Sequence, residues 1–241
     1  MKDTGYPCNS PSSRGTRRPR HRIFSQIKAL VRFLLPRHRV IGSEHLRNFP
    51  AVFLCNHAGS YAPMMAELYF PVPFRPWVTY QVMTPKLCRS YIDLDFVRKE
   101  LGLRTPLSGL VAAAIEPFCI QIMKSVEAIP VYKGTWKIRQ TFRLSLEALR
   151  KGENLLIFPE NQEKKYSRFL NGFNSGFLRL SRLYYQSAGK PLYYYPVFIS
   201  RQNRTISIGE PIKDAGGSRE SRKHLRSRLE QAVEKLAEKP C

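Results

Sequence analysis

A histidine and a glutamate each come after a short apolar run with the composition of a buried strand. His57 follows the run 51–55 closely, and Glu160 follows the run 155–158 through Pro159. Side chains at the carboxyl ends of sheet strands face the crevice where α/β proteins usually bind ligands. An imidazole there suits general-base chemistry, because its unperturbed pKa lies near physiological pH. We therefore expect His57 to be the catalytic base and Glu160 to lie at the same edge of the sheet.

Each of these residues also has a structural interpretation. A histidine in a strand-to-helix turn can simply fill the turn, and a carboxylate after a proline turn can cap a helix or meet a lysine. A third candidate, Lys133, follows the apolar run 128–132 and suits a phosphate as a point charge. An exposed lysine at a strand end needs no ligand, however. For each residue taken alone, both interpretations stay open.

Short apolar runs that alternate with longer helical patterns indicate the fold that must position these residues. Strands separated by helices indicate an α/β sheet with helices packed over its faces. The expected strands cover 51–55, 128–132, 155–158, 193–199 and 205–208. The expected helices cover 63–70, 110–125, 136–150 and 173–186, followed by a charged, solvent-facing helix over 218–238.

The segments before residue 41 differ in character from this domain, which we expect to cover 41–241. Residues 1–22 are rich in Pro, Ser, Gly and Arg and lack apolar periodicity, so they predict a disordered basic tail. Residues 23–40 predict an amphipathic membrane-docking segment, whose helix ends at Pro36, because apolar residues recur there at three- and four-residue steps between cations. A helix that packs on the domain core is the alternative.

The chain carries a formal net charge of +22, which favours a negative partner: nucleic acid, an anionic bilayer or an acidic protein. The aromatic residues lie mostly inside strand-like runs, as at 193–195, which argues against nucleic acid. The longest apolar stretch, 110–123, is shorter than the roughly 20 residues that cross a bilayer, and it contains Glu116. We therefore expect an anionic membrane surface as partner, no nucleic acid, and a chain that lies on the membrane.

The cysteines are odd in number and scattered, with no close pairs at metal-ligand spacing. They stand at positions 8, 55, 88, 119 and 241, and no secretory signal precedes them. This pattern predicts a reduced, intracellular setting, with no metal and no redox cofactor.

Taken in order, the segments resemble the lysophospholipid and glycerol-phosphate acyltransferase family over about residues 41–212. Asn56-His57 resembles its first block, a histidine followed five positions later by aspartate, and Phe158-Pro159-Glu160 resembles its third. Residues 129–133 resemble its second block, and residues 195–197 resemble its fourth. Residues 209–212 resemble a strand-and-turn often found near the end of such domains. The resemblance implies a central mixed, largely parallel sheet flanked by helices.

The same resemblance implies an activity. A fatty acyl group would move from an acyl thioester, acyl-CoA or acyl carrier protein, to a hydroxyl of a lysophospholipid or glycerol-phosphate-type acceptor in phospholipid biosynthesis or remodelling. His57 would take the hydroxyl proton, and no cofactor is implied beyond the thioester co-substrate. The protein would be peripheral, on the cytoplasmic face of a membrane. The implied substrate-binding residues are Asn56, Ser60, Lys133, Phe158, Pro159, Glu160 and Asn161.

The chain departs from the family pattern five positions after His57, where Ala62 stands in place of the aspartate. In the family this carboxylate orients the imidazole and stabilises the imidazolium, as in the serine protease triad. Three arrangements stay open. A backbone carbonyl can orient the ring, or the chain can be a catalytically impaired relative that binds lipid without transferring an acyl group. Alternatively, another carboxylate reaches the ring, from Glu67, Asp93, Asp95 or Glu160.

Overall fold

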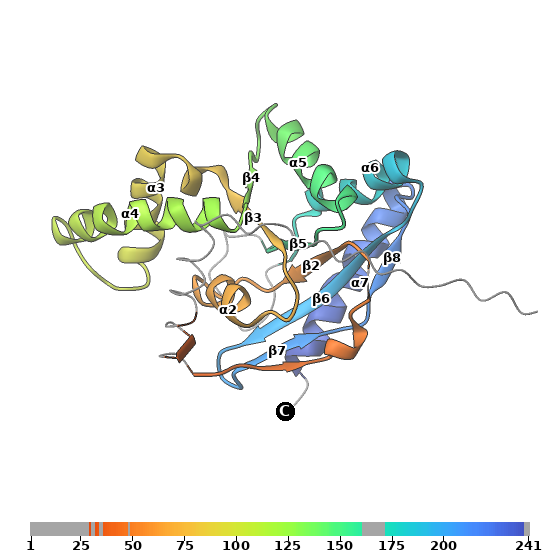
Figure 1. Ribbon diagram of the computed structural model, residues 1–241, viewed down its shortest axis with the longest axis horizontal. Coiled ribbons are helices and arrows are strands. Elements are labelled where there is room, and N and C mark those ends of the chain that lie inside the picture. The colour runs from red at the N-terminus through yellow and green to blue at the C-terminus, as the bar shows by residue number, and fades with distance from the viewer. Residues whose placement is uncertain (1–28, 30–31, 34–35, 48, 161–171, 239–241) are drawn as a thin grey trace, which may run out of the picture.

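The centre of the protein is an eight-stranded mixed sheet in the order β1-β7-β6-β2-β5-β3-β4, with β8 also pairing β6 (Figure 1). The computed structural model describes residues 29, 32–33, 36–47, 49–160 and 172–238. Neighbours from β6 to β4 pair in parallel, whereas β7 and β8 run antiparallel to β6. The predicted α/β class with a largely parallel sheet is confirmed. The strands are β1 Arg39–Ile41, β2 Ala51–Cys55, β3 Arg75–Thr79, β4 Ile129–Val131, β5 Leu155–Ile157, β6 Leu192–Ser200, β7 Thr205–Ile208 and β8 Ile212–Asp214.

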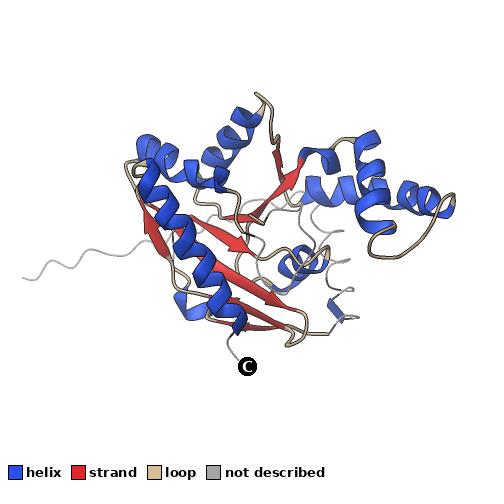
Figure 2. Ribbon diagram, turned by 180° about the vertical axis from the view of Figure 1, so that it is seen from behind, coloured by secondary structure: helices blue, strands red, loops and turns tan. Residues whose placement is uncertain are grey.

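Helices cover the two faces of the sheet (Figure 2). The side chains of β2 alternate between these faces, as the strand period of two requires. Val52 and Leu54 point into the core with α5, α6 and α7, while Phe53 and Cys55 point into the core with α2. The helices are α2 Tyr61–Tyr69, α3 Pro85–Tyr91, α4 Leu107–Ser125, α5 Ile138–Arg150, α6 Arg179–Ala188 and α7 Arg219–Glu238. Shorter helical segments are η1 Ser43–His45, η2 Tyr80–Met83, η3 Ile92–Val97, a π-helix, and η4 Ser175–Leu178.

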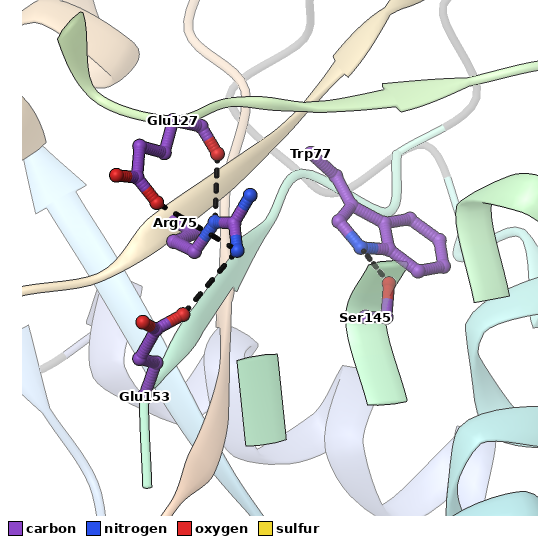
Figure 3. Close-up of polar contacts among 5 residues, drawn as sticks. All are labelled: Arg75, Trp77, Glu127, Ser145 and Glu153. Atoms are coloured by element: carbon purple, nitrogen blue, oxygen red, sulfur yellow. Dashed lines mark hydrogen bonds and ion pairs between the residues drawn. The ribbon is translucent and has the colours of Figure 1, made fainter. Parts of the chain in front are cut away.

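Strand β3 was not predicted, because Arg75 and Pro76 interrupt its apolar character. The side chains of β3 nevertheless fix it between β5 and β4 (Figure 3). Arg75 Nε donates to the carbonyl oxygen of Glu127 at 2.8 Å, and the guanidinium pairs with Glu153 at 3.3 Å. The Trp77 indole donates to Ser145 Oγ on α5 at 2.9 Å. Polar partners supplied by distant segments therefore satisfy the groups that made this strand hard to predict.

Residues 80–125, which we call the arm, comprise η2, α3, η3 and α4 and project beyond the β4 edge of the sheet (Figures 1 and 2). The sequence predicted only part of α4 here. It also led us to expect no apolar stretch of membrane-crossing length, and that expectation was wrong. The helix begins at Leu107, and its 19 residues are long and apolar enough to cross a membrane by length and composition.

Helix α7 also differs from the prediction of a solvent-facing helix. Leu225, Leu229 and Val233 recur every four residues and are buried in the core with β6 and α6. The Glu230 carboxylate accepts the backbone N–H of Phe173 at 2.6 Å, just before η4. One stripe of α7 therefore belongs to the core, and its charged residues occupy the remaining faces.

The predicted basic tail, 1–22, lies outside the described residues, as does most of the predicted docking segment, 23–40. The last two residues of that segment, 39 and 40, belong to β1. Arg32 packs against α2, where its Nε donates to the carbonyl oxygen of Leu68 and its guanidinium lies 5.8 Å from the Tyr69 ring centroid. These contacts join one residue of the segment to the domain and do not test membrane docking, which stays a prediction.

Candidate functional site

The turn after β2 brings His57 and Glu160 into contact. Because β2 and β5 are parallel neighbours, their carboxyl ends meet at one edge of the sheet, as the sequence predicted. The backbone N–H of His57 donates to Glu160 Oε1 at 2.8 Å. Burial raises the pKa of the Glu160 carboxyl, and this hydrogen bond opposes the rise. Glu160 therefore holds the main chain of the turn that carries the imidazole.

The His57 side chain is half-buried and lines a cavity. Its ring meets the Phe158 ring edge-on, with centroids 5.2 Å apart and an interplanar angle of 72°. Burial lowers the pKa of His57 below 6.5, while a hydrogen bond to its own backbone and the Glu100 carboxylate act in the opposite direction. A histidine with a lowered pKa is neutral at physiological pH and can accept a proton.

Glu100, which the sequence analysis did not single out, closes over the same turn from the arm. Its two carboxylate oxygens accept the Ser60 backbone N–H at 2.9 Å and the Ser60 hydroxyl at 2.5 Å. The turn reaches this contact through Gly59, whose φ is +60° and where an added Cβ would lie 2.9 Å from Glu100 Oε1. A carboxylate from a distant segment thus holds the turn that follows His57, and its charge opposes the lowering of the His57 pKa by burial.

The other residues considered for that missing carboxylate have different surroundings. Glu67 and Asp95 line the cavity. Asp93 pairs with Arg98 at 2.7 Å, and hydrogen bonds from Ser108 and Arg98 lower its pKa. Ala62 itself lies in the first turn of α2, and its side chain is fully buried in the core that the helix covers.

Asn56, predicted to bind substrate, is buried and holds the turn against β6 instead. Its Nδ2 donates to the carbonyl oxygen of Ile199 at 3.2 Å, and its Oδ1 accepts the Ile199 N–H at 2.8 Å. It is not among the described residues that line the cavity. Its position indicates that it orients the end of β2, so that the next residue, His57, faces the cavity.

The cavity has a volume of about 2100 Å³ and extends from the His57 turn between the sheet and the arm. Its apolar wall includes Leu68 and Phe74 around α2, Trp77 on β3, Met123 on α4 and Phe142 on α5. Asn161 lies outside the described residues. The predicted site residues that line the cavity are His57, Ser60, Lys133, Phe158, Pro159 and Glu160.

A cluster of cations lines another part of the cavity wall. Arg179 begins α6, and four more cations come from the first two turns of α7: Arg219, Arg222, Lys223 and Arg226. Steps of three and four residues place those four on one face of the helix, a signal that was visible in the sequence. Positive charge near a helix N-terminus opposes the helix dipole, so these positions favour an anionic ligand. Within the described residues, no three His, Cys, Asp or Glu side chains are grouped to hold a metal ion.

Fold and site together define an α/β protein with a histidine at the strand ends of a largely parallel sheet, facing a part-apolar, part-cationic cavity. The same fold is found in the crystal structure of the 1-acyl-sn-glycerophosphate (LPA) acyltransferase PlsC from Thermotoga maritima. The TM-score is 0.56 and the identity 16%, over 92% of this chain and 83% of that one. No family model matches the chain, and no curated protein matches it in sequence. At this identity the likeness establishes the fold.

Proposed function

We propose that this protein transfers a fatty acyl group from an acyl thioester, acyl-CoA or acyl carrier protein, to a hydroxyl of a lysophospholipid or glycerol-phosphate-type acceptor. The observation that carries the proposal is the His57 imidazole, neutral by its lowered pKa, facing a cavity with an apolar wall and a cationic cluster. An amphiphile with a phosphate and an acyl chain has the matching chemistry. The protein would act as a peripheral protein at the cytoplasmic face of a membrane.

In this mechanism the acceptor hydroxyl attacks the thioester carbonyl carbon. His57 takes the hydroxyl proton as the new C–O bond forms, and it returns a proton to the sulfur as the C–S bond breaks, which releases an ester and a thiol. No covalent enzyme intermediate is required, since holding both substrates in one cavity supplies the proximity. Phe158 and Glu160 hold the ring and its main chain in place.

Different residues of the cavity would bind different parts of the substrates. Lys133 and the α6–α7 cations are placed to bind phosphate groups, with lysine acting as a point charge and arginine as a fork. The apolar wall would take the acyl chain. Glu100 would contribute to stabilising the imidazolium formed during the reaction.

The test is transfer of labelled acyl groups by the purified protein, using acyl-CoA and acyl carrier protein donors with lysophospholipid or glycerol-phosphate acceptors. His57→Ala should lower turnover by about 100-fold or more, the range that general-base catalysis contributes. His224→Ala, an exposed histidine on α7, is the matched control and should retain activity.

A wild-type protein that binds labelled lysophospholipid but forms no product with any donor would be the lipid-binding relative left open by Ala62. Full activity in His57→Ala would exclude His57 as the base. Liposome binding that survives in His57→Ala is expected under either function, so product formation decides between them.

A further inference from the structure

The arm contains a helix whose outward face is apolar. On α4, Leu107, Leu110 and Phe118 are 52%, 68% and 69% exposed, and their spacing continues through the exposed Ala114. The opposite face of α4 packs on α3 and η3 around Cys88, Ile92 and Ala112. A helix that is apolar on all sides belongs in a protein core or in contact with lipid. Just 11% of the most apolar stretch of α4 is buried, so the protein core does not account for it.

Two further apolar side chains of the arm are also exposed. Leu94 on η3 is 54% exposed, and Leu101, which follows it, is 49% exposed. We call the outward apolar face of α4 the arm surface: Leu107, Leu110, Ala114 and Phe118. Apolar patches of this kind mark sites that contact a protein partner or a membrane.

The way α4 is held excludes a bilayer crossing in this fold. Its inner face is packed along α3, η2 and η3, and Glu116 pairs with Arg89 of α3 at 2.8 Å. The chain enters β4 at Ile129, a few residues after the helix ends, and β4 is part of the central sheet. Crossing would separate α4 from these partners. The helix can meet lipid with its outward face alone, lying along the surface.

We propose that the arm surface docks this protein on an anionic bilayer. Exposed cations on the arm include Lys86 and Arg104, whereas Arg98 and Lys99 are ion-paired with Asp93 and Asp95. The chain as a whole carries a net charge of +22, which attracts anionic lipid but repels a second copy of the same chain. Charge complementarity therefore favours a bilayer over a dimer as the occupant of this surface.

Docking through the arm gives the cavity access to lipid. The inner side of the arm lines that cavity through Tyr91, Phe96, Ile122 and Met123, while its outer side carries the arm surface. An amphiphile leaving the bilayer would pass along the arm to His57 without crossing bulk water. This step rests on the proposed acyltransferase function, whereas the docking itself is independent of it.

Vesicle co-sedimentation tests the docking directly. The full-length protein should bind vesicles of phosphatidylcholine with about a quarter phosphatidylglycerol more tightly than phosphatidylcholine alone, and less tightly as salt rises. Leu110→Asp with Phe118→Asp should weaken the partition coefficient by about 100-fold, since each exposed apolar side chain contributes through burial in lipid. Tyr185→Asp, at a 46% exposed residue of α6 far from the arm, is the matched control and should bind as the wild type does.

Wild-type vesicle binding by the double variant, with its fold verified by circular dichroism, would overturn the proposal. A concentration-dependent dimer that the double variant abolishes, with vesicle binding unchanged, would assign the surface to a second copy instead. Activity separates docking from catalysis: the double variant should transfer acyl groups normally to a short-chain, monomeric acceptor and lose activity toward acceptor embedded in vesicles. Wild-type protein that binds vesicles through the arm but transfers nothing would leave docking in place and remove the proposed function.

Discussion

The two carboxylates beside His57 come from regions built in different ways. Glu160 belongs to the sheet: it follows β5, lies half-buried, and holds the His57 main chain. Glu100 belongs to the arm: it is exposed, and it holds the Ser60 backbone and hydroxyl. The turn is therefore fixed from one side by the core and from the other by a projecting element. We expect the sheet carboxylate to be required for the structure of the site, and the arm carboxylate to affect its activity and pH dependence.

Removal of the sheet carboxylate should have the larger effect. Glu160→Ala leaves the His57 N–H without its acceptor, at a cost of about 1–3 kcal/mol in the free energy of unfolding. Displacement of the turn should lower kcat/KM by about 100-fold, because a misplaced catalytic group loses its alignment. Chemical denaturation and the acyl transfer assay measure the two effects. Glu160→Gln keeps an acceptor oxygen and should retain most of both, whereas equal losses in the two variants would contradict a hydrogen-bonding role.

Removal of the arm carboxylate should leave the fold intact and change the pH profile. The wild-type kcat/KM should fall as pH drops through the His57 pKa, which lies below 6.5, because the protonated ring cannot act as a base. Glu100 raises that pKa, so Glu100→Gln should move the acid limb to still lower pH and reduce kcat by about tenfold. Glu44→Gln, at an exposed carboxylate on η1 that does not line the cavity, serves as the control. An acid limb that stays in place would show that Glu100 acts on the turn's structure alone.

Gly59 links the two regions, and its substitution should have the smallest effect. Alanine there would adopt φ near +60°, which costs about 1–2 kcal/mol, and its Cβ would press on the Glu100 carboxylate. Gly152→Ala is the matched control, because that glycine also has a positive φ of +81° but no atom within 4 Å of an added Cβ. Both variants should lose similar stability in thermal melts. Gly59→Ala should lower activity severalfold, whereas Gly152→Ala should not. Equal activity in the two variants would show that the contact between this turn and Glu100 does not affect activity.

The sequence predicted the sheet side of the site because its signals are local. Apolar runs mark β2 and β5, and parallel pairing then brings His57 and Glu160 together. Glu100 carries no comparable signal: it stands in a polar stretch after η3, and its contact with Ser60 joins segments 40 residues apart in the chain. Local pattern predicts elements, whereas contacts between distant elements depend on packing that the pattern does not encode.

Two further differences between prediction and structure arise on helices that carry both charged and apolar residues. On α7 the density of cations concealed the buried stripe of Leu225, Leu229 and Val233, although both recur at helical spacing. On α4 the single Glu116 suggested a helix unsuited to lipid, yet its ion pair with Arg89 removes it from the outward face. In both helices the overall composition was misleading, whereas the face on which each residue lies identifies the buried and exposed sides.

The position of β2 in the middle of the sheet has a consequence for how the chain folds. Its two neighbours, β5 and β6, both lie more than a hundred residues further along the chain. During synthesis this wholly apolar strand must wait, unpaired on both edges, until those partners emerge. Such long-range pairing predicts slow folding with a late-forming nucleus, and a nascent chain that depends on chaperones until its last third has been made.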